Sequence, residues 1–504
     1  MSWSPDGVPI SYKPHAVFAL SDVEESDYPR CPIRVGMDAR KGWAQHQPPR
    51  QPFDKTLIAA VRNLVEALAR GRQLNDLDGG LGRAAETYQD LHPAIRKFLD
   101  VASLNYLEFI DTREQAVGPL KYVTFSSNRK INDEMSLKLW APVYETRAKT
   151  REVHRLRYGT ARSVPTTWSR GAAWIVSQGC SQVSVFECGL GDGSDFPLLN
   201  FTPTHVIAEI HDRETLPQLR KTCAANKPFP GPDCLRCSAI AVCPVPISMN
   251  VLPGMRDETP WVRGLSEATL IRYGVCPAKE FLKAQHLPAD RNLTESAERG
   301  LRVHKWIAEA HASSSSCADA LLIAGTGVPE DAPYLEAHVS VCKRAGLRSL
   351  ASEQTLVGWD AGIGDVIFMK PDEVLMREDD TLVLREIKTT TKESALDVNI
   401  AWQQFSNTVT WWLAVLKGGL LQHFGAARGQ VELEVLTPAG GAVHTISTES
   451  RDAGLKIAGW ALDVPIMWLT DNVFCPNPGP HCSQCDVIRW CTAEQASHEQ
   501  ASNS

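Results

Sequence analysis

The chain has 504 residues, of which 43% are hydrophobic and 22% charged, and its formal net charge is −7. This length exceeds what one hydrophobic core usually fills, so we expect two or three domains. The acidic balance argues against a protein that coats nucleic acid nonspecifically, although it leaves room for a local basic channel. No stretch approaches the ~20 apolar residues that cross a bilayer, and the N-terminus lacks a secretory pattern, so we expect a cytoplasmic protein without membrane contact.

Two segments of the first half have a recognisable character. Glycine and polar residues over 74–86 predict a loop. Arginine and lysine are dense from Glu145 to Arg170. Such a run fits a path for a nucleic-acid backbone and, equally, a solvated helix face.

The second half reads as an α/β domain. Helical spacing extends over 265–274, Pro277 can open a new helix because its missing N–H falls in an already unpaired first turn, and helical spacing returns over 295–312. The later pattern is, in order, strands at 362–376 and 380–390, a helix at 399–417, and strands at 430–438 and 442–448. We expect weaker boundaries at a loop over 311–320 and at a disordered polar tail over 494–504.

One cysteine frame occurs twice in the chain. Each copy has a Cys-Pro pair and, about two hundred residues later, the pattern Pro-Gly-Pro-x-Cys-x2-Cys-x5-Cys. The first copy comprises Cys31, Cys234, Cys237 and Cys243, and the second comprises Cys276, Cys482, Cys485 and Cys491. Grouped thiols in a large chain bind metal more often than they form disulfides, and this spacing is poor for zinc, whose structural sites usually come as two close pairs. Each copy therefore predicts a four-thiolate metal site.

The two copies divide the chain into comparable halves. Cys31 and Cys276 lie 245 residues apart, whereas the two cysteine trios lie 248 residues apart, a difference that one short insertion explains. Further residues match at the first offset. We therefore predict an internal duplication, with one module over 1–255 and a second over 256–493.

Chemically useful side chains concentrate in two predicted strands of the second half. Asp365 follows Gly364 at the start of one apolar strand, and Glu386 and Lys388 lie two residues apart on the other. Because alternate residues of a strand share a face, Glu386 and Lys388 point the same way while Ile387 points into the core. Two carboxylates hold Mg²⁺ or Mn²⁺, which polarises a phosphate and activates water, and an ammonium group orients that water or neutralises charge. The pattern predicts phosphodiester cleavage.

These motifs resemble the PD-(D/E)XK nucleases, and among them the RecB-like branch that includes CRISPR-adaptation exonucleases with an iron–sulfur cluster. The resemblance covers Ser266 to Cys491 and rests on YGVCPAKEFL, ERGLRVHKWIAE, GIGDVIF, LREIKT, WQQF and HCSQCDVIRWC. It implies a restriction-endonuclease-like α/β fold, a core of mixed sheet flanked by helices, which the duplication would repeat in tandem. It also implies DNA as the substrate, with preference for single strands or duplex ends.

The resemblance assigns roles to individual residues. It implies a metal site of His304, Asp365 and Glu386, and a catalytic set of Asp365, Glu386, Lys388 and Gln404. Gln403 is the neighbouring candidate for the helix glutamine. Thr408 stands where the family usually has a tyrosine, so the chain departs from the pattern at that helix.

The resemblance also assigns the cysteines. It implies a [4Fe-4S] cluster on Cys276, Cys482, Cys485 and Cys491, which would tie the start of the nuclease fold to its end. By the same logic, Cys31, Cys234, Cys237 and Cys243 form a second cluster. Cys223 competes for the fourth position of that site, and a zinc site or an empty relic are the alternatives.

The remaining thiols are not grouped in the sequence. Cys475 is a spare candidate for the second cluster, although a structural thiol fits it better. We expect the others to be buried as small apolar residues, namely Cys180, Cys188, Cys317 and Cys342.

The offset between the halves predicts that only one of them cuts. The offset of 245 places Leu120, Ala141 and Val143 at the positions of Asp365, Glu386 and Lys388, and Ala59 and Gly159 at those of His304 and Gln404. None of these side chains binds metal or moves a proton. We therefore predict that the first half is an inactive scaffold, nucleic-acid guide or docking face.

The sequence favours one function over two alternatives. The favoured function is a metal-dependent DNA nuclease, an exonuclease of DNA repair, recombination or phage defence. A noncatalytic nucleic-acid-binding or assembly subunit is the first alternative, and a zinc-dependent regulator is the second. The chain has no G-x4-G-K-[ST] phosphate loop, so we expect unwinding to come from a helicase or another defence or repair subunit.

Overall fold

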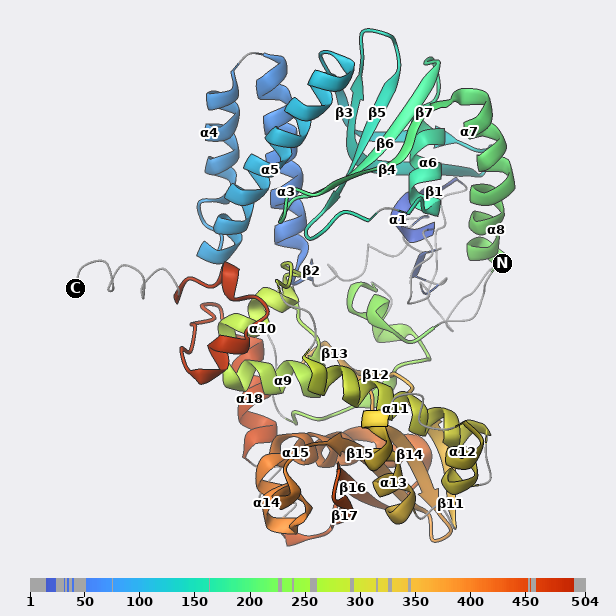
Figure 1. The fold of residues 1–504 in the computed structure, drawn as a ribbon, viewed down its shortest axis with the longest axis vertical. Helices are drawn as coiled ribbons and strands as arrows, with labels where there is room; N and C mark the ends of the chain where they lie inside the picture. The colour runs from blue at the N-terminus through green and yellow to red at the C-terminus, as the bar shows by residue number, and fades with distance from the viewer. Residues whose placement is uncertain are drawn as a thin grey trace, which may run out of the picture. The chain divides into compact units, whose positions relative to one another are not determined.

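The computed structural model describes most of the chain. The described residues are 15–23, 31, 34–35, 39, 51–74, 76–162, 164–224, 229–237, 240–253, 261–290, 294–313, 316–324, 329–342, 346–451, 454 and 459–493. Contacts divide the chain into two compact units. The first unit comprises Met1–Val242, Ala278–Asp290 and Val473–Ser504, and the second comprises Cys243–Pro277 and Arg291–Asn472 (Figure 1). The predicted tail, 494–504, lies outside the described residues.

The first unit is a mixed sheet with helices on both faces (Figure 1). Its strands are β1 (Ala16–Ala19), β3 (Lys121–Lys130), β4 (Met135–Glu145), β5 (Arg151–Arg157), β6 (Gln182–Gly189) and β7 (Asp195–Pro203). Its helices are α1 (Leu20–Val23), α3 (Lys55–Gln73), α4 (Leu77–Tyr88), α5 (Pro93–Val117), α6 (Thr167–Val176), α7 (Thr204–Ile210) and α8 (Leu216–Ala224), with α10 (Pro277–Ala284) and the short strand β2 (Gln51–Pro52). Val153 of β5 packs in the core with α6, while its neighbour His154 faces α5, so the two helices cover opposite faces of the sheet.

The segment over 74–86 was predicted as a loop, and that prediction is wrong. It forms most of α4, which begins after Asp76, whose side chain accepts a hydrogen bond from the Gly79 N–H. A Cβ on Gly80 would lie 3.0 Å from the Ala67 carbonyl oxygen of α3. Glycine therefore serves close packing of two helices here, and its presence does not signal a turn.

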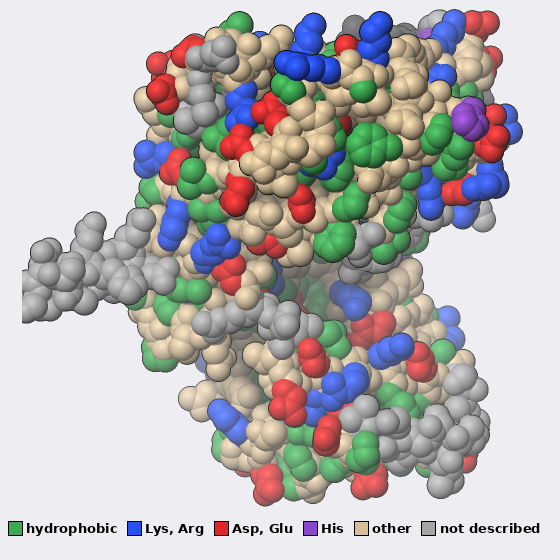
Figure 2. Space-filling view, turned by 45° about the horizontal axis from the view of Figure 1, so that its top comes forward, with side chains coloured by type: hydrophobic (Ala, Val, Ile, Leu, Met, Phe, Trp, Pro, Cys, Tyr) green, Lys and Arg blue, Asp and Glu red, His purple; other side chains and the backbone are tan. Residues whose placement is uncertain are grey.

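The basic run from Glu145 to Arg170 forms strand β5 and its flanks rather than a solvated helix face. Arg155 and Arg157 of this strand both pair with the buried carboxylate of Glu187 on β6. These arginines therefore hold the sheet together. On the face shown in Figure 2, acidic and basic side chains are interspersed.

The second unit contains a five-stranded mixed sheet in the order β11-β14-β15-β16-β17 and a smaller mixed sheet in the order β10-β13-β12-β8. Its strands are β8 (Ile247–Met249), β9 (Trp261–Val262), β10 (Leu265–Ser266), β11 (Leu347–Ser352), β12 (Leu356–Asp360), β13 (Asp365–Met369), β14 (Glu373–Arg377), β15 (Thr381–Thr389), β16 (Arg428–Thr437) and β17 (Gly440–Ser447). Its helices are α9 (Glu267–Val275), α11 (Glu295–Ser313), α12 (Cys317–Ala324), α13 (Ala332–Val341), α14 (Val398–Gln404), α15 (Ser406–Val415), α16 (Leu421–Phe424) and α18 (Trp460–Thr470).

The helices predicted at 265–274, Pro277 and 295–312, and the strands predicted at 380–390, 430–438 and 442–448, are confirmed. The segment 362–376 is two strands, β13 and β14, which belong to different sheets. The helical pattern at 399–417 is divided between α14, α15 and a following π-helical turn. The predicted α/β fold with a mixed sheet flanked by helices is therefore correct.

The two units share a sheet topology. In the second unit the order is β11-β14-β15-β16-β17, and the successive pairs are antiparallel, antiparallel, parallel and antiparallel. In the first unit the order β3-β4-β5-β6-β7 has the same four relations. Each unit also joins its only parallel pair of this series through helices, α6 in the first and α14 and α15 in the second.

No helix in the described part of the chain is long and apolar enough to cross a membrane.

Candidate active site

Strand β15 presents two charged side chains on one face. The Lys388 Nζ donates to Glu386 Oε1 at 2.6 Å, as expected from their spacing of two. Ile387 between them points into the apolar core with Val303 and Ile307 of α11. The other oxygen of Glu386 accepts a hydrogen bond of 3.0 Å from Trp412 Nε1 on α15. The Glu386 carboxylate is therefore fixed from two sides, and it is 5% exposed.

A second carboxylate lies beside Glu386, and it belongs to Asp372. Glu373 pairs with Arg385 across β14 and β15, so the preceding residue lies next to Glu386. The Ile387 N–H donates to Asp372 Oδ2 at 2.6 Å. This bond holds Asp372 at the turn into β14, against the strand that carries Glu386.

Helix α11 adds a histidine to this pair. His304 Nδ1 lies 2.9 Å from Asp372 Oδ1 and 3.5 Å from Glu353 Oε1. One ligand atom from each of these three residues lies within 4.8 Å of the others, as a metal site requires. His304, which the sequence resemblance predicted as a metal ligand, therefore lies beside Asp372 and Glu353.

Asp365 was predicted as the first carboxylate, but the structure uses it differently. Its Oδ1 accepts from the N–H groups of Gly264 and Val366, at 3.0 and 2.6 Å, and its Oδ2 accepts from the Arg263 N–H at 3.0 Å. Asp365 is completely buried. It therefore fastens the chain before β10 to the start of β13, whereas Asp372 is the carboxylate that meets His304.

Burial and neighbouring charges shift the ionisation of the two central carboxylates. Burial, Asp372 and Glu267 together raise the pKa of Glu386 to about 8, against the opposing effect of Lys388. Burial likewise raises the pKa of Asp372. A nearby cation would therefore stabilise the ionised form of both carboxyl groups.

The cationic groups of the site are stabilised by their carboxylate neighbours. Burial disfavours the ammonium of Lys388, but Glu386 and Glu267 outweigh it and raise the pKa of Lys388. Burial also opposes the charge on His304. Hydrogen bonds to Asp372 and Glu353 outweigh burial and raise the pKa of His304 to about 10. The His304 bond in turn lowers the pKa of Glu353 to about 2.

The helix after β15 departs from the expected pattern. Gln403 and Gln404 are both exposed at the end of α14. Thr408 is buried, and its hydroxyl donates to Glu267 Oε1 at 2.5 Å. Glu267 lies 3.8 Å from the Lys388 ammonium, so the threonine position supports the lysine through this carboxylate.

Comparison with known proteins decides the class of this site. Residues 265–492 match the sequence model of the PD-(D/E)XK nuclease superfamily. This segment is a PD-(D/E)XK nuclease domain. The segment contains the pair Pro371-Asp372 and the triplet Glu386-x-Lys388, and the Pro-Asp pair is a sequence signal that points to Asp372.

Other comparisons add less. The solved structure titled "Crystal structure of SSO0001" is 16% identical, covers 46% of this chain and 86% of its own, and has a TM-score of 0.25. It is one of 17 solved chains that match. No curated protein matches the sequence.

Divalent metal is the cofactor class that fits this nuclease domain. Carboxylate oxygens suit Mg²⁺ and Mn²⁺, and an imidazole is compatible with Mn²⁺. The side chains placed to hold such an ion together are those of His304, Glu353 and Asp372, and Glu386 lies beside Asp372 across the β14–β15 pair.

The two cysteine trios adopt one local conformation. In each, a Gly-Pro pair leads into a short 3₁₀ helix, Pro232–Arg236 or Pro480–Gln484, and the last cysteine follows a second one, Ile240–Val242 or Ile488–Trp490. The N–H of the second cysteine donates to the carbonyl of the first in both, at 3.2 and 3.1 Å. The described cysteines form no disulfide.

The fourth cysteine of each frame stands differently. The Cys31 N–H donates to Asp233, the neighbour of Cys234, at 2.9 Å. Cys276 belongs to the second unit and its trio to the first, while Cys243 belongs to the second unit and the rest of its frame to the first. The side chain of Cys223 lies outside the described ones, and Cys475 is exposed.

In the first unit, strand β5 corresponds by topology to β15. Its Glu152 and His154 have the spacing of Glu386 and Lys388, and they lie 2.9 Å apart. Arg113 of α5 clasps Glu152 with two hydrogen bonds of 2.9 and 3.0 Å. Tyr106 and Tyr144 close the group, and the Tyr106 hydroxyl lies 3.0 Å from His154 Nδ1.

This correspondence replaces the gapless alignment of the halves. Ala141 and Val143, which that alignment matched with Glu386 and Lys388, lie on β4, and Leu120 lies just before β3. The shared topology instead pairs β5 with β15. The offset differs because the helical region before the sheet has a different length in each half.

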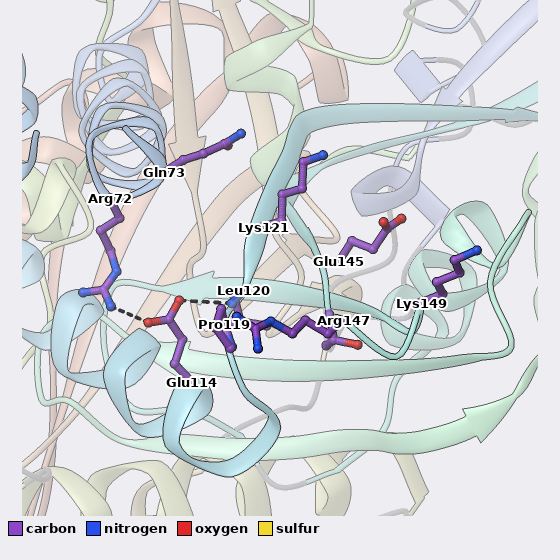
Figure 3. Close-up of a pocket in the computed structure, with 10 residues that line it drawn as sticks. Arg72, Gln73, Glu114, Pro119, Leu120, Lys121, Glu145, Arg147 and Lys149 are labelled. Carbon is purple, nitrogen blue, oxygen red and sulfur yellow. Dashed lines mark hydrogen bonds and ion pairs between the residues drawn. The ribbon is translucent and has the colours of Figure 1, made fainter. Parts of the chain in front are cut away.

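The first unit also has a pocket of about 850 Å³ (Figure 3). It lies at the C-terminal ends of α3 and α5, where Arg72 binds Glu114 and the Leu120 N–H donates to the same carboxylate. Lys121, Arg147 and Lys149 also line it. It contains no counterpart of the nuclease residues, so the chemistry of the domain is not placed there.

Proposed function

We propose that the protein is a Mg²⁺- or Mn²⁺-dependent deoxyribonuclease whose reaction is carried out by residues 265–492. The observation that supports this most strongly is that Asp372, just before β14, meets Glu386 and Lys388 of β15, with His304 beside them. We further propose an exonuclease that acts on single strands or duplex ends in repair, recombination or phage defence, with a helicase or similar subunit as partner. The sequence resemblance supports these finer assignments.

Each residue has a role that follows from its surroundings. Asp372, Glu386, His304 and Glu353 would hold the metal, which when bound polarises the scissile phosphate and activates water. Glu386 has a raised pKa, so near neutral pH it gives up a proton as the cation binds. Lys388 remains an ammonium, and it donates a hydrogen bond to the attacking water or to the phosphate as negative charge develops.

The decisive experiment compares two aspartates in the full chain. Cleavage of labelled single-stranded and duplex DNA is measured with Mg²⁺ or Mn²⁺ for Asp372→Asn and Asp365→Asn, beside Glu386→Gln and Lys388→Met. We expect losses of at least ~100-fold for Asp372, Glu386 and Lys388 variants. Asp365→Asn should lower thermal stability, because it loses charged hydrogen bonds to backbone, while the folded fraction still cleaves.

Two results would contradict this assignment. Cleavage that survives in Asp372→Asn but disappears in a folded Asp365→Asn would return the ligand role to Asp365. Undiminished cleavage in the Asp372, Glu386 and Lys388 variants alike would exclude the nuclease reaction at this site.

We also propose that the first unit is a related module that has lost its metal site. Shared topology supports the relation, and the Arg113 guanidinium supports the loss, because it already places a positive charge on Glu152. Such a module fits the alternative function, a nucleic-acid-binding or assembly scaffold, for this part of the chain. Glu386→Gln should abolish all cleavage while Glu152→Gln leaves it, and residual metal-dependent cleavage in Glu386→Gln that Glu152→Gln removes would refute the loss.

Finally, we propose a [4Fe-4S] cluster on Cys276, Cys482, Cys485 and Cys491, and a second on Cys31, Cys234, Cys237 and Cys243. The matching conformation of the two trios supports equivalent use of both frames. Iron and sulfide are measured in anaerobically purified protein, with Cys276→Ser and Cys31→Ser for comparison. About eight irons per chain indicate two clusters, about four indicate one, and zinc in place of iron rejects the assignment.

A further inference from the structure

Four side chains of types that bind metal lie close together on α11, α12 and α13 and at the end of α13 in the second unit. They are His311, Cys317, His338 and Cys342, and one ligand atom from each lies within 4.8 Å of all the others. The sequence predicted Cys317 and Cys342 as buried apolar thiols outside any group; Cys317 is buried and Cys342 half-buried, but both lie in one group with two histidines. The two sulfurs lie 3.6 Å apart and each faces an imidazole.

The distances match the edges of a zinc tetrahedron. Bonds of about 2.3 Å to sulfur and about 2.05 Å to nitrogen give edges of about 3.8 Å for S···S, 3.3 Å for N···N and 3.6 Å for S···N. The observed separations are 3.6 Å between the sulfurs and 3.2 Å between the His311 and His338 Nε2 atoms. Two of the four S···N separations are 3.3 Å from Cys317 to His338 and 3.4 Å from Cys342 to His311.

Two buried carboxylates orient the histidines. Glu434 Oε1 lies 2.6 Å from His338 Nδ1, and Glu373 Oε1 lies 2.7 Å from His311 Nδ1. Each carboxylate keeps the proton on Nδ1, so the lone pair of each Nε2 points to the centre of the group. Carboxylate support of this kind is the usual surrounding of a histidine that binds zinc.

We propose that His311, Cys317, His338 and Cys342 form a structural zinc site. All four positions are filled by protein ligands and both histidines are well buried, which is typical of a structural rather than a catalytic zinc. The ion joins α11, α12 and the end of α13, and through Glu373 and Glu434 it anchors them to β14 and β16. His304 lies two helical turns before His311 on α11, so the zinc also fixes the helix that carries the nuclease histidine.

The experiment measures zinc in the purified full chain. Zinc per chain is determined by mass spectrometry of the metal content for the unchanged protein, Cys317→Ser and Cys342→Ser. Cys180→Ser is the matched control, because Cys180 is a half-buried thiol of the first unit that bonds only backbone carbonyls in the described structure. We expect each of the first two variants to hold about one zinc fewer than the unchanged protein, and Cys180→Ser to lose none. Iron should be the same in all four proteins, which separates this site from the cysteine frames.

A second variant keeps the proposal testable if the cysteine variants fail to fold. Glu434→Gln retains all four ligands and should weaken zinc binding about 10–100-fold in competition with a chromophoric chelator. Co²⁺ in place of zinc should give the visible bands of a tetrahedral thiolate site, and these bands should disappear in Cys317→Ser. Equal zinc in the unchanged protein and both cysteine variants would overturn the proposal, as would a Cys317–Cys342 disulfide in protein alkylated without reduction.

Discussion

Replacing Trp412 by Phe tests whether the hydrogen bond to Glu386 sets the metal affinity of the nuclease site. The change removes the 3.0 Å bond from Nε1 to the Glu386 carboxylate, both groups being buried. A bond to a charged acceptor contributes about 1.5–3 kcal/mol. Because that bond favours the ionised carboxylate, its loss raises the pKa of Glu386 further above its usual range.

The consequence appears in the metal requirement. A cation that displaces a proton from Glu386 binds more weakly as that pKa rises, so we expect the Mg²⁺ concentration for half-maximal cleavage to increase about 10–100-fold. The deficit should shrink as the pH is raised toward the new pKa, because the carboxyl then loses its proton without help from the metal. Cleavage rates measured across Mg²⁺ concentration at several pH values test both statements.

The neighbouring residue supplies the control. Trp411 is as deeply buried as Trp412, and its Nε1 has no hydrogen-bond partner among the described residues. Trp411→Phe removes the same volume but no hydrogen bond, so it should leave the metal requirement unchanged. Equal Mg²⁺ requirements in the two variants, or a larger one in Trp411→Phe, would refute the role of the Trp412 bond.

Three further predictions concern stability and metal. Ionised Glu152 stabilises the folded protein by about 3 kcal/mol. Burial opposes its charge, but hydrogen bonds with His154 and Arg113 outweigh burial and lower its pKa from 4.5 to about 2. Because the pKa is lowered, this stabilisation is complete above about pH 4.5 and is lost as the pH falls toward 2. Urea unfolding should therefore show a difference between the unchanged protein and Glu152→Gln that narrows with acid, and a constant difference would contradict it. In α4, Gly82→Ala has no atom within 4 Å of its new Cβ and should stabilise by about 0.5–1 kcal/mol, whereas Gly80→Ala meets α3 and should not, as thermal unfolding can show. Excess EDTA should abolish cleavage and added Mn²⁺ restore it, and cleavage that persists in EDTA would exclude a metal-dependent reaction.

Sequence patterns predicted correctly those structural features that depend on residues close together in the chain. The helix that ends before Cys276, the helix opened by Pro277 and the shared face of Glu386 and Lys388 all follow from periods of 3.6 or two residues. The prediction at 362–376 was wrong because the alternation of apolar residues continues across Pro371, so alternation alone does not show that β13 and β14 are separate strands of different sheets. The loop predicted at 74–86 failed because helix packing, which is nonlocal, uses glycines that resemble a turn signal.

The sequence by itself determined the α/β class, the twice-repeated cysteine frame, and the Glu386-x-Lys388 pair on its strand, because these depend on order and periodicity. Only the tertiary structure decided that Asp372 meets His304, that Arg113 covers the corresponding glutamate of the first unit, and that Cys317 shares a site with two histidines. Each of these groups joins residues from different helices and strands. Their distances depend on strand register and helix packing, which spacing along the chain does not specify.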